Sequence, residues 1–575
     1  MKRKSFAVVA MAGVLAATMS TGVIQIHAEN GQPPAGNNGG TPPEKPDGNG
    51  NGGTPPDGGG GADTMTYDYS GTMSGKKTAD GKEVTSDGEI IDSDTTDQNA
   101  ALSENGGTLK ITNGTLSKSG DDTNGDNCNF YGINSISLTA GEKSKSEISD
   151  SRLTADSEGS NGIFATDSGT VYADNDTITT AKGNSRGLDA TYSGTIIANQ
   201  MNISTKGDHS ASIATDRGGG DISVTNSTLK TEGSGSPLLY STGNIQVDHV
   251  SGTSSGSQIA GMEGLNTILI YNSELTSTQK DKTASDPVAD GVIIYQSTSG
   301  DAESTTGEAA TFQVSNSKLK SAITSGSMFY VTNTKANIVL SNTTLDFDSD
   351  KADLLLVQGN DANNWGTAGS NGAKVKFTGL KETLKGNITA DTISSADVYL
   401  LDGTTWTGAA SIEENSVNTS LTDAPLTVNV SNDSTWVVTS DSTVTNLNVE
   451  DGGKVVDSDG KTVSIVVNGE TKVKGDSDLT VTVKGTYGTS FETSDDNKLS
   501  SDYIDRTDFD QTYSTSTSFG TNGDSASTET ANQKTSVSSD KNDASSDHTA
   551  QYIGAAIGIV IVAGVIVFLI RRKKK

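Results

Sequence analysis

A repeat with a period of about 25 residues limits the fold of this chain more than any other feature of its sequence. Segments such as TVYADNDTI, TIIANQMNI and DISVTNSTL share the pattern apolar-x-(small or apolar)-x-Asn-x-x-apolar. The polar position of the pattern recurs at 150, 175, 200 and 226. An apolar column ahead of it recurs at a constant spacing and comprises Ile163, Leu188, Ile213 and Leu238.

Such a period fits one coil of a parallel β-solenoid, whose short strands stack on those of the next coil at about 4.8 Å. Apolar residues at one phase then line the interior. Asparagines at one corner hydrogen-bond from coil to coil and satisfy the backbone at the bend, a structural role that needs no ligand. We predict an all-β parallel β-helix over residues 66–371. Its corner column is expected to contain Asn113, Asp150, Asn175, Gln200, Asn226, Asn272, Asn316 and Asn342.

The repeat changes character after residue 371. Strand pairs such as AKVKFTG and DVYLLDGTTWTG follow, and Trp406 and Trp436 occupy comparable places in two successive units. We expect residues 372–485 to continue the β-helix with wider coils.

The two ends of the chain predict an exported, membrane-anchored protein. Three cations followed by the apolar run FAVVAMAGVLAA make residues 1–28 a signal peptide. Residues 552–570 carry no charge and would be about 28 Å long as a helix, which is enough to span a bilayer. The sequence RRKKK at 571–575 then marks the cytoplasmic side. The expected location is therefore the cell membrane, single-pass, with the remainder outside the cell.

Two segments have compositions that cannot bury a core. Residues 29–65 are rich in Gly and Pro and are expected to form a disordered arm. Residues 486–551 are rich in Ser, Thr and Asp and are expected to form a stalk between the β-helix and the membrane.

Charge and composition exclude several classes of protein. The net charge of −31 repels phosphate backbones, so nucleic acid is not an expected partner. Cys128 is the one cysteine, which excludes a disulfide framework and a cysteine-rich metal site. Four histidines leave little for metal or imidazole chemistry, and no cofactor is expected.

The repeats resemble right-handed parallel β-helix domains, the architecture of pectate-lyase-like enzymes and of many bacterial surface proteins. The stretch DSTWVVTSDSTVTNLNVEDGGKVV at 433–456 looks like the C-terminal part of autotransporter passengers, pertactin-like adhesins among them. The whole layout is similar to cell-surface proteins of Gram-positive bacteria. Autotransporters end in an outer-membrane barrel, whereas this chain ends in an apolar segment, so the resemblance implies a scaffold and not a self-export mechanism.

The β-helix scaffold also hosts polysaccharide lyases and hydrolases, which need clustered carboxylates and, for lyases, a basic side chain. The middle of the chain has three arginines. Arg186 has Asp189 nearby, and Arg217 has Asp216 and Asp221 nearby. Arg217 follows Arg186 by 31 residues, about one coil plus six positions, so the two arginines are candidates for neighbouring corners. A solvated turn arginine is the alternative interpretation, and no paired-acid motif is present.

The loop GDDTNGDNCNF at 120–130 has acids and amides at alternating positions, as calcium loops do. A calcium loop of the EF-hand type would then need Gly and Glu where this chain has Asn127 and Ile133. A polar turn is the favoured interpretation, Cys128 is expected to be inert, and no metal site is assigned.

These observations predict an adhesin-like or glycan-binding display protein without catalytic, cofactor or metal residues. Its expected partner is an extracellular glycan or matrix protein, because a solenoid offers a long face for repeated shallow contacts with a polymer. The alternative is a polysaccharide lyase or glycoside hydrolase on the same scaffold.

Overall fold

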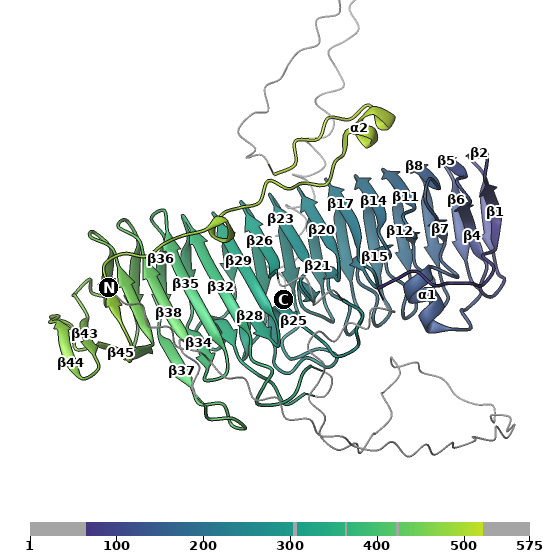
Figure 1. Ribbon diagram of the computed structural model, residues 1–575. Helices are drawn as coiled ribbons and strands as arrows, with labels where there is room; N and C mark the ends of the chain where they lie inside the picture. Colours follow the sequence, from purple (N-terminus) through teal and green to yellow (C-terminus); the bar gives the residue numbers. More distant parts are fainter. Residues whose placement is uncertain (1–64, 303–307, 363–364, 421–424, 521–575) are drawn as a thin grey trace, which may run out of the picture. The chain divides into compact units, whose positions relative to one another are not determined.

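The computed structural model describes residues 65–302, 308–362, 365–420 and 425–520. Their strands stack as successive coils, each coil contributing one strand to each of three long faces (Figure 1). Almost every pairing is parallel, so the prediction of an all-β parallel β-solenoid is confirmed. Its handedness stays a prediction.

The first face, sheet A, has 13 strands. They are β1 Gly75–Asp80, β4 Asn99–Glu104, β7 Ser137–Ala140, β10 Ile163–Thr166, β13 Leu188–Ala190, β16 Ile213–Thr215, β19 Leu239–Ser241, β22 Ala260–Glu263, β25 Asp290–Tyr295, β28 Ser327–Thr332, β31 Asp353–Val357, β34 Ile388–Asp391 and β37 Ala410–Glu413.

The second face, sheet B, has 15 strands. They are β2 Glu83–Asp87, β5 Thr108–Thr112, β8 Lys145–Ser149, β11 Thr170–Asp174, β14 Gly194–Asn199, β17 Gly220–Thr225, β20 Asn244–Asp248, β23 Thr267–Tyr271, β26 Ala310–Ser315, β29 Lys335–Ser341, β32 Lys374–Leu380, β35 Ser395–Leu401, β38 Leu426–Val430, β41 Asn446–Val449 and β46 Tyr487–Gly488.

The third face is sheet C, which sheet D replaces in the later coils. Sheet C contains β3 Ile90–Ser93, β6 Thr115–Lys118, β9 Arg152–Ala155, β12 Thr177–Thr180, β15 Asn202–Thr205, β18 Thr228–Thr231, β21 Ser251–Ser254, β24 Glu274–Ser277, β27 Lys318–Ser321 and β30 Thr344–Asp346. Sheet D contains β33 Thr383–Lys385, β36 Thr405–Gly408, β39 Thr435–Val438 and β42 Lys454–Val456.

A small sheet E and three short helices complete the described elements. Sheet E contains β40 Ser442–Val444, β43 Ser464–Val467, β44 Glu470–Val473 and β45 Thr480–Val483, with β43 and β44 antiparallel. The helices are α1 Gly125–Tyr131, the 3₁₀ helix η1 Asp495–Asn497 and α2 Thr507–Tyr513. The antiparallel hairpin lies late in the chain, where a solenoid needs its exposed strand edge covered.

The predicted interior column is confirmed for three of its four members. Ile163, Leu188 and Ile213 pair in register on successive strands of sheet A and are fully buried in the main core. The partner of Ile213 is Leu239 and not Leu238. Leu238 is also fully buried, so its burial was predicted correctly but its register was wrong by one position.

The error comes from a single insertion in a turn. Ala190 pairs with Thr215, 25 residues later in the chain, whereas Gly194 pairs with Gly220, 26 residues later. The extra residue therefore lies in the turn at 216–219, which carries Arg217. A prediction that assumes a constant period across that turn therefore assigns the next column position one residue too early, at Leu238 in place of Leu239.

The coils after residue 371 were predicted to be wider, and the strand register shows that this is wrong for most of them. Lys374 pairs with Ser395, and Thr435 pairs with Lys454, both at shorter spacings than the pair Ile163 and Leu188. Trp406 and Trp436 do pair in register, and their rings stack at a centroid distance of 4.9 Å. The additional length of that one coil lies between β37 and β38, in a connection and not in the strands.

The corner column is explained by backbone conformation. All eight predicted positions have φ between 46° and 58°, the left-handed region that Asn and Asp tolerate best among residues with a side chain. Nδ2 of Asn342 donates to Oδ1 of Asn316 at 2.8 Å, whereas Asn175 donates to the carboxylate of Asp150 at 2.6 Å. The ladder therefore mixes amide and carboxylate acceptors. The pattern search missed His249, which has φ 56° and lies midway along the chain between Asn226 and Asn272.

Replacing Asn226 with leucine should lower the free energy of unfolding by about 1 to 3 kcal/mol. Leucine is strained at φ 51°, and the bond from Asn226 Nδ2 to Oδ1 of Asn199, 2.8 Å long, is lost. Urea unfolding followed by circular dichroism measures the change. Asn226→Gly relieves the backbone strain without restoring the hydrogen bond, so its free energy of unfolding should lie between those of the parent and Asn226→Leu. Equal stability of all three proteins would contradict this account.

The predicted signal peptide 1–28, the membrane span 552–570 and the tail 571–575 lie outside the described residues, as does nearly all of the arm 29–65. Among the residues that are described, no helix is long and apolar enough to cross a membrane.

The beginning of the predicted stalk differs from expectation. Residues 489–520, which we call the C-terminal strap, run back along the outer face of sheet B (Figure 1, yellow-green). Gln313 binds the strap backbone with both amide atoms, at Lys498 O and Ser500 N. Gln246 does the same at Asp502 O and Ile504 N. The side-chain amides thus supply hydrogen bonds to strap backbone groups that a neighbouring strand would otherwise satisfy.

The far half of the strap is held by one arginine and several rings. Arg506 donates to the backbone oxygens of Ser223 and Ala198 at 2.9 and 3.1 Å. Phe509 packs on Tyr172 and Ile197, and Phe519 packs on Tyr271. These contacts bury the few aromatic side chains of a segment that is otherwise rich in Ser and Thr. Because the average composition of the segment is polar, composition alone predicted a stalk here.

Replacing Arg506 with alanine should release the far half of the strap. The change leaves several buried acceptors on sheet B without a donor, at a cost of about 1–3 kcal/mol for each such group. We expect limited proteolysis of the strap to become at least about tenfold faster, since about 1.4 kcal/mol changes an opening equilibrium tenfold. Lys498→Ala, at an exposed ammonium, is the matched control and should cleave like the parent.

Candidate ligand-binding site

The outer side of sheet A carries an apolar row that segments outside the repeat partly cover. Leu102, Leu138 and Phe164 follow one another on neighbouring strands, at positions that alternate with the buried interior column. They form a second apolar cluster with Ile133 and Ala140. The same row continues through Asp189, Ala214 and Tyr240. Helix α1 and the segment before β1 pack on this face and build a site there.

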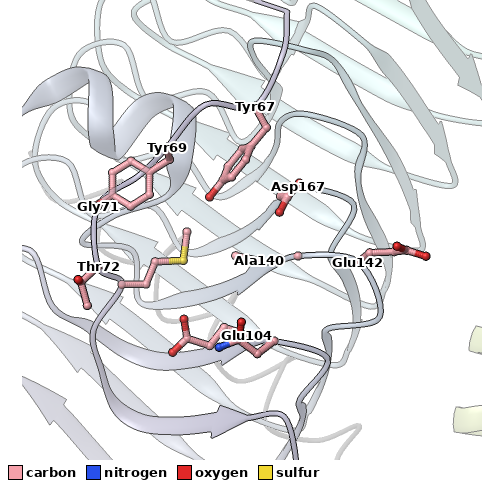
Figure 2. Close-up of a pocket in the computed structure, with 11 residues that line it drawn as sticks. Tyr67, Tyr69, Gly71, Thr72, Glu104, Ala140, Glu142 and Asp167 are labelled. Atoms are coloured by element: carbon pink, nitrogen blue, oxygen red, sulfur yellow. The ribbon is translucent and has the colours of Figure 1, made fainter.

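A pocket of about 570 Å³ opens on this face beside the first coils (Figure 2). One wall is the segment 67–73 before β1, and the other walls are the turns that follow β4, β7 and β10. In Figure 2 the rings of Tyr67 and Tyr69 lie on one side and Glu104 on the opposite side, whereas the carboxylate of Glu142 points away. The lining residues are Tyr67, Tyr69, Gly71, Thr72, Met73, Glu104, Asn105, Ala140, Gly141, Glu142 and Asp167.

Four tyrosines form a continuous aromatic array at the pocket. The Tyr67 ring is nearly perpendicular to the rings of Tyr131 and Tyr192, at centroid distances of 5.6 and 5.5 Å. Tyr131 stacks on Tyr192 at 5.6 Å and lies 4.9 Å from Tyr69. Rings held by one another and by α1 are a preformed surface, so a ligand would not need to order them.

The pocket is electronegative. Among the described residues, those that line it include three carboxylates and no lysine, arginine or histidine. Burial raises the pKa of Asp167, and burial together with the charge of Asp80 raises the pKa of Glu104. Burial, then the charge of Asp167, raises the pKa of the Tyr67 hydroxyl. The three carboxylates, with no cation among the described lining residues, therefore oppose additional negative charge at the pocket.

The sequence search missed this pocket. Tyr67 and Tyr69 lie in TMTYDYSG, just after the Gly- and Pro-rich arm, which was predicted to end at residue 65. This segment matches none of the repeat units. The available signal was a pair of closely spaced tyrosines in a chain that is only 5% aromatic. The partners Tyr131 and Tyr192 come from α1 and a later coil, which no local pattern connects to them.

The two candidate arginines do come close to acids on the same side of sheet A. Arg186 lies 3.0 Å from Asp216 and 3.5 Å from Asp189. Nε of Arg217 donates to Asp301 at 2.5 Å, and its guanidinium lies 3.7 Å above the ring of Phe130. We call these five charged residues the arginine cluster. Asp221 does not belong to it, because it lies on β17 in sheet B and accepts from Asn244.

The arginine cluster is largely closed to solvent. The side chains of Arg186, Asp189 and Asp216 are 10%, 0% and 8% exposed. Burial raises the pKa of Asp216 to about 7 although Arg186 opposes the shift, and burial raises the pKa of Asp189 well above its usual range. One guanidinium between two buried carboxylates is therefore an ion-pair network of the interior, and the interpretation of Arg186 as a solvated turn residue is wrong.

A fourth acid, beside the three aspartates of the cluster, had no sequence signal. Glu263, at the end of β22, accepts a hydrogen bond from the Tyr240 hydroxyl at 3.0 Å and others from Ser297 and Ser299. Burial raises its pKa. Two of these partners come from the long connection between β25 and β26, so only the tertiary structure brings them together.

The calcium-like loop has a structural explanation. Asn124 is the N-cap of α1, and its side chain accepts from the backbone of Asp126 at 2.9 Å and of Asn127 at 3.2 Å. Cys128 is fully buried in that helix, and burial raises the pKa of its thiol well above its usual range. No group of three or more metal-binding side chains was found in the described part of the chain.

Comparison with known proteins identifies no family. No protein-family model matches the chain, and no curated protein matches it. Among solved structures, the cryo-EM structure of the Vag8–C1 inhibitor complex covers 72% of this chain and 100% of its own, with 12% identity and a TM-score of 0.27. A likeness at that level carries no argument, so the assignment of a β-solenoid rests on the parallel sheets themselves.

Proposed function

We propose that this chain is a glycan-binding, adhesin-like protein and that the pocket lined by Tyr67 and Tyr69, which we call the tyrosine pocket, is its binding site. The observation that carries the proposal is the pairing of half-buried aromatic rings with hydrogen-bond acceptors in one preformed pocket. A sugar ring presents C–H groups on its faces and hydroxyls at its edge, so it fits rings on one side and the oxygens of Glu104, Asn105 and Asp167 on the other.

The test is a glycan array probed with the full-length chain, followed by titration of the best ligand. Tyr67→Ala and Tyr69→Ala should each weaken binding at least about fivefold, because each removes a ring worth about 1–3 kcal/mol of contact. Tyr399→Ala is the matched control, since Tyr399 packs against Phe491 far from the pocket. Binding that survives both pocket variants, or no binding to any glycan or matrix protein, would overturn the proposal.

Polysaccharide cleavage is the second candidate, and one observation favours it. Asp216 has a pKa of about 7 beside Arg186, which suits proton transfer near neutral pH. Against it stands the closure of the arginine cluster, which leaves its carboxylates little contact with a polymer. We therefore expect neither unsaturated uronides nor new reducing ends from pectin, alginate or glycosaminoglycans. Product formation that Arg186→Ala abolishes would establish an enzyme instead.

We also propose that the β-helix is displayed outside the cell. The support is in the sequence, where residues 6–17 and 552–570 are apolar and carry flanking cations. Protease added to intact cells should release a β-rich fragment. An ectodomain that stays protected until the cells are lysed would contradict this location.

A further inference from the structure

We infer that the tyrosine pocket takes a cationic group, specifically the ammonium of an amino sugar, in preference to a neutral or carboxylated sugar. This inference rests on the proposed glycan-binding function and names the ligand class for the same pocket. Two independent properties of the pocket support the inference: its aromatic wall and its negative charge.

The aromatic walls supply the first argument. A cation is attracted to the face of an aromatic ring within about 6 Å of its centroid. Tyr67 and Tyr69 line the pocket, and behind them Tyr131 and Tyr192 complete an array whose neighbouring centroids lie 4.9 to 5.6 Å apart. The two rings that line the pocket favour an ammonium group, which is attracted to a ring face, over a hydroxyl group, which carries no charge; Tyr131 and Tyr192 hold these rings in place.

The charges supply the second argument. Glu104 and Asp167 line the pocket, and Asp68, which accepts a hydrogen bond from the Tyr131 hydroxyl, lies beside it. Within the described part of the chain, no cationic side chain lines the pocket to neutralise them. A uronic acid or sialic acid would place its carboxylate against these groups, which costs free energy in a partly desolvated site, whereas an ammonium would pair with them.

The matched ligands are oligomers of glucosamine and of N-acetylglucosamine, which share ring and linkage but differ in charge. We expect the full-length chain to bind the glucosamine disaccharide at least about tenfold more tightly at physiological salt, and not to bind oligogalacturonate. Short oligomers and moderate salt matter because a chain with a net charge of −31 attracts any long polycation.

Asp167→Asn keeps the shape of the side chain and removes its charge. It should reduce the ratio of the affinities for the glucosamine and N-acetylglucosamine disaccharides from at least about tenfold to about twofold or less. Asp402→Asn is the control, an exposed corner aspartate at φ 54° where asparagine is equally tolerated. Glucosamine binding that Asp167→Asn leaves unchanged would overturn the inference.

The outcomes separate the inference from the function beneath it. Equal affinity for both disaccharides, lost in Tyr67→Ala, would overturn the cationic preference and keep the glycan-binding pocket. Loss of binding to every glycan tested would overturn both.

Discussion

Replacing Ile213 with aspartate is expected to destabilise the β-solenoid by several kcal/mol. The side chain is fully buried in the main core, with Leu188 and Leu239 on either side of it in the stack. A carboxylate there must be buried among apolar neighbours or taken up as a neutral acid, and both cost free energy. Because each coil contacts only its neighbours, the defect also weakens the coupling between the two halves of the stack.

Urea unfolding with hydrogen exchange measures both consequences. The midpoint should fall, and exchange should become faster first in coils adjacent to Ile213. Thr228→Asp is the matched control, since Thr228 is exposed on β18 and its substitution leaves the charge in water. Equal unfolding of Ile213→Asp and the parent would show that the register of sheet A is wrong.

Replacing Arg186 with methionine is expected to cost about 3–5 kcal/mol near pH 8, the usual result of leaving buried charges without their partner. Asp189 and Asp216 both depend on this one guanidinium. Methionine keeps much of the side-chain volume, so the loss reports on charge and not on a cavity. Arg152→Met, at an exposed arginine on β9, is the control and should change stability by less than about 0.5 kcal/mol.

The loss from Arg186→Met should depend on pH. The carboxyl pKa of Asp216 is raised from 3.8 to about 7 on folding, so the folded protein binds more protons than the unfolded chain between those values. The contribution of this group to stability is then greatest below its unfolded pKa and falls as pH rises toward 7. Removing Arg186 removes the interaction that lowers this pKa, so the variant should go on losing stability above about pH 7, where the parent levels off. A pH-independent difference would contradict the ion-pair account.

The repeat predicted the fold because a solenoid is built from local rules. Each corner requires a left-handed residue, so Asn and Asp recur at 113, 150, 175 and beyond, and each strand requires an inward apolar residue. Each of these requirements concerns a single residue type at a nearly constant spacing, so it can be recognised in the sequence. The same rules explain the miss at Leu238, because one residue inserted in the Arg217 turn changes the spacing without changing the pattern.

The candidate site was only partly predictable. Asp189 was expected near Arg186 from adjacency in the sequence, and the two arginines were candidates for neighbouring corners. The pairing of Arg186 with Asp216 and the burial of the cluster were not predicted, because the cover comes from α1 and from the long connection after β25. The tyrosine pocket could not be predicted, since its rings come from three places between residues 67 and 192.

The sequence by itself determined the period, the corner residues and the inward face of each coil, because these depend on contacts between successive turns of the chain. Only the tertiary structure decided what lies on the outer faces. The strap on sheet B and the pocket on sheet A are made by segments outside the repeat. Their contacts, such as Arg506 with Ser223 and Tyr67 with Tyr192, join residues that no periodic rule relates.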